Sequence, residues 1–364
     1  MGLSIGIVGL PNAGKSTVFN ALTRAAVAVA AYPFTTIEPH HGVVPVPDPR
    51  LAAVAAVTHP DRTVQATVDF VDIAGLVRGA SAGEGLGNQF LGHIREVDAV
   101  AHVVRCFPDP DVPHVEGAVD PVRDIEVVET ELALADLAVV EREIEHTHSR
   151  VRAHDARAEE HLAMLKAVAE ALKRGVQGRR LPPNADRGAL LRPLRLLTDK
   201  PVVYVANVAE TDLPAGGPGA DRVREHAREV GAGAVVLAAK LEADAAALTE
   251  AEAAEFLRVY GLEERGLQTL IHAAYRLLDL VTYLSTASKE VRAWSVARGT
   301  RAPQAAGQIH TDMERGFIRA EVIHWEALVA AGSLRAAHDH GLVRLEGKEY
   351  VIQDGDVVQF RFAV

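Results

Sequence analysis

Short apolar runs alternate with loops and helical patterns in the first third of the chain and again after residue 200. We interpret the runs as buried strands, because they are short and mostly rich in β-branched residues. They are Leu3–Val8, Val68–Ile73, Ala99–Val104, Val202–Ala206 and Ala234–Ala238. A helical pattern, Val18–Leu22, follows the first run. This order predicts an α/β fold with a doubly wound, mostly parallel sheet.

A long helical insertion interrupts the order between Val104 and Val202. Apolar residues recur at three- to five-residue steps from Ile125 to Ile144 and again from Leu162 to Val176. The polar stretch Glu145–Glu160 separates the two patterns. This periodicity predicts an inserted α-helical hairpin of two long amphipathic helices packed antiparallel.

The C-terminal part changes character. The pattern Leu267–Leu284 predicts a helix, and short β-rich runs separated by glycines follow it, among them Val357–Phe362. We therefore predict three parts. A core domain comprises residues 1–120 and 199–281, the helical hairpin occupies 121–198, and a small β-rich domain occupies 282–364.

Composition narrows the class of protein. The 364 residues suit roughly two to three domains. A composition of 48% apolar and 24% charged residues excludes extensive disorder. Cys106 is the only cysteine, which excludes an internal disulfide scaffold and favours a reducing, cytoplasmic setting. No secretory signal and no apolar run of about 18 residues is present, so we expect no membrane partner.

Charge is distributed unevenly along the chain. The net charge of −11 argues against a protein that binds nucleic acid over its whole surface, and we expect no DNA partner. Residues 141–200 nevertheless hold 13 basic against 9 acidic residues. This segment is a candidate docking face for a polyanion, although a solvated helix face is the plainer interpretation.

The segment Gly9–Ser16 reads GLPNAGKS and matches the phosphate-binding loop pattern G-x-x-x-x-G-K-[ST]. It lies between a predicted strand and a predicted helix, as a P-loop requires. The glycines let backbone N–H groups turn towards a phosphate at a helix N-terminus. Lys15 supplies a positive charge for the β- and γ-phosphates, and the Ser16 hydroxyl is placed to ligate Mg²⁺.

Two further segments fit a P-loop protein that binds a nucleoside triphosphate. Asp72 ends a predicted strand and begins a D-x-x-G motif, which suits a carboxylate that acts on Mg²⁺ through water. Gly75 lets its backbone N–H approach the γ-phosphate. Thr35 and Thr36 lie between the two motifs, and one of them is expected to close over Mg²⁺. Spacing alone does not decide which.

The predicted strand Val202–Ala206 leads into Asn207-Val208-Ala209-Glu210, at the place where GTPases carry N-K-x-D. The Asp of that motif accepts two hydrogen bonds from guanine. Glu210 is one methylene longer, so guanine would lose a well-placed acceptor. A guanine N–H left buried and unpaired would cost about 1–3 kcal/mol of binding free energy. Asn207 can still address the N7 edge of a purine. The site therefore favours relaxed specificity or ATP, and an ordinary loop after a strand is the plainer interpretation.

Together these segments resemble the Obg-like ATPase family, also called YchF. The resemblance is carried by GIVGLPNAGKST, YPFTTIEPHHGVVPVPDPRL, the run from Asp69 to Val100, NVAE and AAKLE. The segments IHTDMERGFIRAEVI and DGDVVQFRF resemble the family's C-terminal TGS domain, which is β-grasp-like. The similarity covers essentially the whole chain in the family's order of domains.

This resemblance implies a P-loop protein that hydrolyses ATP in preference to GTP and associates with the ribosome. It places the phosphates on Asn12–Thr17, adenine against Asn207 and Val208, and the Ala239-Lys240 pair beside the base. The expected nucleotide-binding residues are Gly9, Asn12, Ala13, Gly14, Lys15, Ser16, Thr17, Asn207, Val208, Glu210, Ala239 and Lys240. The expected Mg²⁺ ligands are Ser16, Thr36 and, through water, Asp72. Ala238 departs from the Ser that GTPases often have.

Catalysis needs a further explanation, because Leu76 stands where GTPases carry the Gln that orients water. The expected catalytic residues are Lys15, Gly75 and His114. His114 lies in CFPDPDVPHVEG, which resembles a recurring family segment, and as a mobile loop histidine it could orient or deprotonate water. A structural histidine is the plainer interpretation. A K⁺ ion held beside Asn12, as in some related P-loop proteins, is the second hypothesis.

The ribosome is the expected partner, and ribosomal RNA of either subunit would meet the helical hairpin and the TGS domain. The candidate basic residues are Arg150, Arg152, Arg157, Lys173, Arg174, Arg179 and Arg180. Two rival functions stay open. One is a conventional Obg-class GTPase. The other is a nucleotide-sensing module that binds ribosomes or RNA and hydrolyses nucleotide only incidentally.

Overall fold

The contacts within the protein divide the chain into two compact units. The computed structural model describes residues 3–27, 40–73, 75–76, 78–81, 86–152, 156–181, 191–287 and 289–363. The first unit comprises Met1–Gly42 and Asp69–Ala274, and the second comprises Val43–Val68 and Tyr275–Val364. This division differs from the bounds expected from the sequence. The segment Val43–Val68 packs with the C-terminal part, and the helical hairpin packs with the first unit.

A six-stranded sheet forms the centre of the first unit. Its strands, in spatial order, are β2 (His40–Pro45), β4 (Thr67–Asp72), β1 (Ser4–Val8), β5 (Ala99–Arg105), β6 (Val202–Asn207) and β7 (Gly233–Leu237). The neighbours from β4 to β7 all pair in parallel. This confirms the doubly wound α/β prediction. The carboxyl ends of β1, β4, β5 and β6 carry the predicted site motifs to one edge of the sheet.

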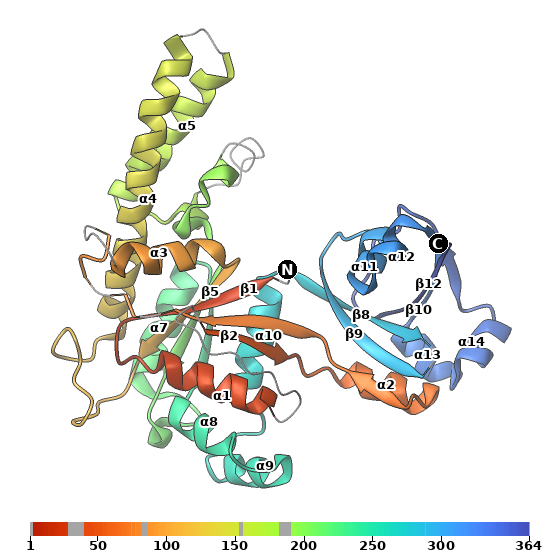
Figure 1. Cartoon of the computed structure of the whole chain (residues 1–364). Coiled ribbons are helices and arrows are strands. Elements are labelled where there is room, and N and C mark those ends of the chain that lie inside the picture. The colour runs from red at the N-terminus through yellow and green to blue at the C-terminus, as the bar shows by residue number, and fades with distance from the viewer. Residues whose placement is uncertain are drawn as a thin grey trace. The chain divides into compact units, whose positions relative to one another are not determined.

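Helices cover both faces of this sheet. They are α1 (Lys15–Val27), α3 (Leu86–Glu96), α7 (Gly217–Glu229), α8 (Ala239–Ala245), α9 (Glu250–Val259) and α10 (Gly266–Leu277). Figure 1 shows α3 on one side of the strands and α1 with α8 on the other. Val128, Tyr204 and Val223 are fully buried in the core between the sheet and the helices. The fold thereby fixes the strand ends that carry the site.

The predicted helical hairpin is present. Helix α4 (Pro121–Arg152) and helix α5 (Ala156–Lys173) run side by side away from the sheet, and we call this pair the arm (Figure 1). Helix α4 continues through the first half of the polar stretch that was expected to separate two helices, as far as Arg152. Short 3-10 turns elsewhere in this unit are Gly178–Arg180, Arg192–Leu194, Leu197–Asp199 and Glu210–Asp212.

The second unit is a mixed sheet with short helices. Its strands, in spatial order, are β11 (Arg344–Glu346), β10 (Phe317–His324), β12 (Asp356–Phe362), β8 (Leu280–Ala287), β9 (Glu290–Ala297) and β3 (Arg62–Val64). Its helices are α2 (Pro49–Thr58), α11 (Ala302–Ile309), α12 (Thr311–Arg315), α13 (Trp325–Ala331) and α14 (Leu334–Asp339). The central pair β8 and β12 is parallel, with antiparallel β9 and β10 outside it. This is the arrangement of a β-grasp.

The prediction of one helix over Leu267–Leu284 is wrong at its C-terminal end. Helix α10 ends at Leu277, Asp279 adopts a left-handed backbone with φ +48°, and β8 begins at Leu280. Val281 and Tyr283 are buried in the core of the β-grasp. Apolar spacing alone did not separate the helix from the strand, because both elements bury apolar residues.

Asp136 fastens the base of the arm to the chain segment that returns to the sheet. It lies on α4 with no exposed surface and accepts hydrogen bonds from the N–H groups of Leu197 (2.9 Å) and Thr198 (2.8 Å). Burial raises the pKa of this carboxyl group, and the two N–H donors oppose that effect. The contact therefore holds the last turn before β6 against α4.

Removing this anchor is expected to destabilise the fold. Asp136→Ala leaves two buried N–H groups unpaired, each of which costs about 1–3 kcal/mol, so we expect a loss of about 2–4 kcal/mol in the free energy of unfolding. Urea denaturation measures it. Glu141→Ala is the control on the same helix, because Glu141 is exposed and its ion pair is with the exposed Lys173, and it should lose less than about 1 kcal/mol. Equal losses would contradict the anchor.

Candidate nucleotide-binding site

The P-loop follows β1 and ends where α1 begins at Lys15. Gly9 has φ +149°, and a Cβ there would lie 2.3 Å from the Val103 carbonyl oxygen. Gly14 has φ +95°, and a Cβ there would lie 2.3 Å from Asn207 Nδ2. Both positions therefore require glycine. The unpaired N–H groups of the first turn of α1 open at this loop, which suits an anion.

Lys15 lies beneath the loop. It is 7% exposed, and its Nζ donates a hydrogen bond to the Leu10 carbonyl oxygen at 2.9 Å. Burial lowers the pKa of the Lys15 ammonium group to about 8, although the negative charge of Asp72 opposes that shift. Lys15 is thus poised to take up a proton when phosphate charge arrives.

Ser16 and Asp72 are brought together from α1 and β4. The Ser16 hydroxyl donates to Asp72 Oδ2 at 2.9 Å, and Asp72 Oδ1 is buried with no hydrogen-bond partner among the residues that the structure describes. This pairing of hard oxygen donors, one of them unsatisfied, fits Mg²⁺ coordination. Thr17 is exposed in the same turn of α1. Thr36 lies outside the described residues.

Gly75 packs directly against the P-loop. A Cβ there would lie 2.9 Å from the Pro11 nitrogen and 3.0 Å from Lys15 Nζ. The next N–H, that of Leu76, donates to the Gly9 carbonyl oxygen at 3.2 Å. The Leu76 side chain is fully buried in the core. Leu76 therefore serves packing at the position where a GTPase places its water-orienting Gln.

Asn207 joins the P-loop to the expected base-binding loop. Its Nδ2 donates to the Ala13 carbonyl oxygen, and its Oδ1 accepts from the Ala239 N–H, both at 2.9 Å. Asn207 and Ala13 are each 3% exposed. The described hydrogen bonds of this side chain are therefore with the protein backbone, and they use its Oδ1 and one N–H of Nδ2.

The other residues expected at the base differ in exposure. The Val208 side chain is buried in the core, so only its backbone is available to a base. Glu210 Oε1 lies 3.9 Å from the Nζ of Lys240, which is 83% exposed. The Glu210 carboxylate, which stands where GTPases place the Asp that binds guanine, therefore has the ammonium group of Lys240 as a neighbour.

Asn12 has a left-handed backbone, with φ +63°, and its exposed side chain donates from Nδ2 to the Pro113 carbonyl oxygen at 3.0 Å. This contact connects the P-loop to residues 107–117, which we call the histidine loop. The loop brings His114 close to the P-loop, although the two are about a hundred residues apart in sequence. That proximity is consistent with the expectation of a functional histidine.

The His114 side chain is only 5% exposed. Its Nε2 lies 2.7 Å from Asp124 Oδ2, and its Nδ1 accepts from the Glu116 N–H at 3.1 Å. The described geometry therefore differs from a histidine with a free ring nitrogen, because both nitrogens are engaged. His114 has to leave this position before it can act on a water molecule.

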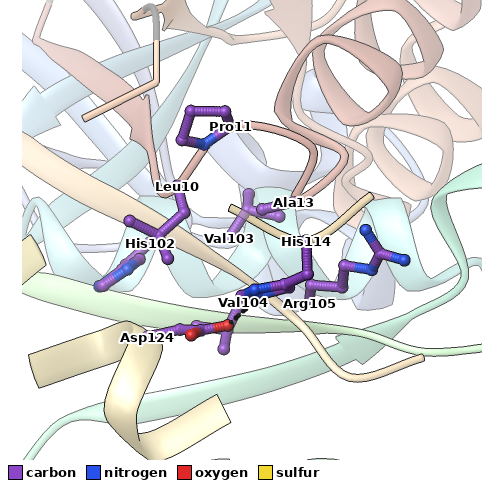
Figure 2. Close-up of a pocket in the computed structure, with 9 residues that line it drawn as sticks. All are labelled: Leu10, Pro11, Ala13, His102, Val103, Val104, Arg105, His114 and Asp124. Carbon is purple, nitrogen blue, oxygen red and sulfur yellow. Dashed lines mark hydrogen bonds and ion pairs between the residues drawn. The ribbon is translucent and has the colours of Figure 1, made fainter. Parts of the chain in front are cut away.

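A small pocket lies between the P-loop, β5 and the histidine loop. Its lining residues, drawn in Figure 2, are Leu10, Pro11, Ala13, His102, Val103, Val104, Arg105, His114 and Asp124. Burial lowers the pKa of His102 to about 3, with the nearby positive charge of Arg179 as the second cause. His102 is therefore a neutral wall of the pocket.

Three further residues hold the loops of this site and had no motif in the sequence. Arg105, 2% exposed, donates from Nε to the Phe107 carbonyl and from Nη2 to the Asp109 carbonyl, so it shapes the histidine loop. Asp124 and Glu131 lie on α4, where acidic residues look like an ordinary solvated helix face. Only the fold shows that both are buried.

Glu131 holds the segment that follows Gly75. It accepts from the N–H of Gly79 at 2.6 Å and from the N–H and hydroxyl of Ser81 at 2.8 and 2.7 Å. Burial alone would raise the pKa of Glu131, but these donors and Arg78 hold it below its ordinary value. Helix α4 therefore holds this segment in place through the carboxylate of Glu131.

The structure corrects one residue of the predicted basic face. Arg179 is not in an exposed connection, because its side chain is 14% exposed and its Nη2 pairs with Glu129 and contacts the Tyr204 hydroxyl. Arg174 and Arg180 are exposed as expected. The side chain of Arg152 lies outside the described residues.

Nucleotide binding should move protons onto Lys15. The group is about half charged at pH 8 in the free protein, and phosphate charge raises its pKa. ATP affinity is therefore expected to fall as the pH rises through 8. Calorimetry in buffers of different ionisation enthalpy should detect uptake of roughly half a proton at pH 8 and much less at pH 7. No uptake at pH 8 would show that Lys15 is already charged.

Comparison with known proteins agrees with this geometry. Residues 4–142 match the family model described as "50S ribosome-binding GTPase", and residues 280–363 match YchF-GTPase_C, described as a protein of unknown function. The chain is 50% identical to "Ribosome-binding ATPase YchF" of Escherichia coli O157:H7 and 47% identical to the protein of that name from Bacillus subtilis, over the full length of both. The solved "Schizosaccharomyces pombe YchF GTPase" is 35% identical with a TM-score of 0.87, covering 99% of this chain and 97% of that one. The chain therefore belongs to the YchF family of P-loop proteins.

Proposed function

We propose that this protein binds and hydrolyses ATP and that its nucleotide state regulates its association with the ribosome. The observation that carries the proposal is that the Asn207 side chain joins the P-loop to the loop expected to bind the base. The chain is also similar over its full length to proteins named ribosome-binding ATPases. We propose that residues 1–120 and 199–281, apart from the segment Val43–Val68 that packs with the C-terminal part, form the nucleotide-binding domain. Residues 121–198 are its insertion and contain the arm, and residues 282–364 form a TGS domain.

Mg²⁺ is the cofactor that P-loop proteins of this fold generally use. Ser16 and Asp72 fit Mg²⁺, because Asp72 Oδ1 is a buried acceptor that has no partner within the described part of the chain. With Thr36 they make up the proposed ligand set, Asp72 acting through water. Bound Mg²⁺ would neutralise charge on the β- and γ-phosphates. K⁺ beside Asn12 is a further proposal, and equal turnover in K⁺ and Na⁺ would count against it.

The proposed catalytic residues act on different parts of the triphosphate. Lys15 places positive charge at the β- and γ-phosphates, and Gly75 offers its backbone N–H to the γ-phosphate. His114 orients the attacking water or removes its proton once it leaves its buried position. Because Leu76 is buried and apolar, turnover without a partner is expected to be slow.

Ribosome contact is proposed for the arm and the TGS domain. The exposed basic residues Arg174 and Arg180, near the base of the arm, can meet RNA phosphates. Among the described residues, no helix has the length and apolar character needed to cross a bilayer. We propose that the protein works in the cytoplasm, where ribosomes are.

Nucleotide preference tests the proposed function most simply. Titration of the protein with ATP and GTP, in Mg²⁺ and K⁺, should give at least tenfold tighter ATP binding, or about 1.4 kcal/mol. Glu210→Asp should narrow this ratio, because the shorter carboxylate restores the acceptor that guanine needs. Tighter GTP binding would replace the proposal with an Obg-class GTPase. ATP-dependent ribosome binding without turnover would favour the nucleotide sensor.

A further inference from the structure

His114 is held in a closed position by the first turn of the arm helix. We propose that Asp124 is a positioning residue that keeps His114 away from the nucleotide until the arm moves. The inference rests on the proposed role of His114 in hydrolysis and adds to it a restraint and the means of release. The restraint is the His114–Asp124 pair, 2.7 Å apart, with each side chain 5% exposed.

The hydrogen-bond pattern assigns the proton of the imidazole ring. The Glu116 N–H can only donate, so Nδ1 of His114 must accept and the proton lies on Nε2. Nε2–H then donates to Asp124 Oδ2. The neutral ring has a single lone pair, on Nδ1, and the Glu116 N–H occupies it. In this position His114 therefore has no free acceptor for a water proton.

Asp124 is itself fixed in place. Its other oxygen, Oδ1, accepts from Arg123 Nη2 at 3.0 Å, and its backbone N–H donates to the Asp120 carbonyl in the first turn of α4. A carboxylate near a helix N-terminus is also favoured by the helix dipole. Because the residue is 3% exposed, its charge-assisted bond to His114 is shielded from water. The restraint therefore belongs to α4 and moves with it.

The histidine loop is tied at the same time to parts of the site that sense nucleotide. Pro113 accepts from Asn12 of the P-loop, and Glu116 pairs with Arg78 at 3.2 Å, in the segment that follows Gly75. Glu131 lies seven residues after Asp124 and thus on the same face of α4. It accepts hydrogen bonds from the N–H groups of Gly79 and Ser81 in that segment. A shift of α4 therefore loosens the histidine and the segment after Gly75 together.

Asp124→Asn tests the restraint, because it keeps the size of the side chain and removes its charge. We expect ATP turnover without ribosomes to rise at least fivefold with KM changed less than twofold, and the stimulation by ribosomes to shrink by the same factor. Asp120→Asn is the matched control. It removes the same charge at the same helix end, where Asp120 pairs with Arg222 and not with His114, and it should behave as wild type.

A second pair of variants tests the other bond to the ring. Glu116→Pro removes the N–H that occupies Nδ1, and it too should raise turnover without ribosomes. Glu116→Ala keeps that N–H and removes the ion pair with Arg78, so it should raise turnover less than Glu116→Pro. These substitutions lie in a loop outside helix α4, so they keep the proposal open to refutation if Asp124→Asn does not fold.

The Nε2–H proton of His114 gives a readout that does not depend on turnover. ¹⁵N-edited NMR should show it in slow exchange with water in wild type and Asp120→Asn, and in fast exchange in Asp124→Asn. Turnover of Asp124→Asn that is unchanged, or as low as that of His114→Ala, would overturn the proposal. If His114→Ala hydrolyses ATP at the wild-type rate, the catalytic role fails. The NMR signal then still decides, separately, whether Asp124 restrains the ring.

Discussion

Helix α4 is bound to the nucleotide-binding unit by three buried carboxylates, and the arrangement of the site depends on them. Asp124, Glu131 and Asp136 are each less than 5% exposed and each accept hydrogen bonds from another part of the chain. Burying a carboxylate is costly unless fixed donors surround it, so these bonds hold only in one placement of the helix. Because α4 continues into the arm, any force on the arm acts on the same bonds. We therefore expect movement of the arm to be coupled to movement of the loops around the phosphate site.

The phosphate site itself depends on close backbone approach at the ends of parallel strands. Gly9, Gly14 and Gly75 each lie where a Cβ would meet another atom at 3.0 Å or less. The P-loop, the segment after β4 and Asn207 thus pack without intervening side chains. Leu76 completes this packing from the core side, which explains how an apolar residue can follow D-x-x-G without disturbing the loop. The same packing puts no polar side chain at this position, and the proposal therefore assigns hydrolysis to the histidine loop, which contacts the P-loop at Asn12.

Much of this could be predicted from the sequence, because the P-loop, D-x-x-G and the strand runs are local patterns with a direct physical reason. The parallel sheet followed from the strand runs, and the arm followed from the helical periodicity. The assignment of Ser16 and Asp72 to one Mg²⁺ site predicted that they lie on the same side of the sheet. The placement of Val43–Val68 with the C-terminal part did not, since that packing is tertiary and leaves no periodic pattern. The exposure of Arg179 was predicted wrongly because a charged residue in a Gly-rich turn looks exposed, whereas here it pairs with Glu129, whose side chain is 13% exposed. Asp124 and Glu131 were missed for the converse reason: acidic residues on a long helix resemble a solvated face.

The central claim is that the nucleotide state reaches the arm through α4, and spin-label distances test it directly. Labels at Asn20→Cys on α1 and Ser149→Cys near the arm tip are both exposed, and Cys106 should not compete for them, because burial raises the pKa of its thiol to about 12. Electron–electron resonance should show a different distance with ADP than with a non-hydrolysable ATP analogue, and Glu131→Gln should abolish the difference. The same difference in Glu131→Gln, or none in the wild-type background, would contradict the account.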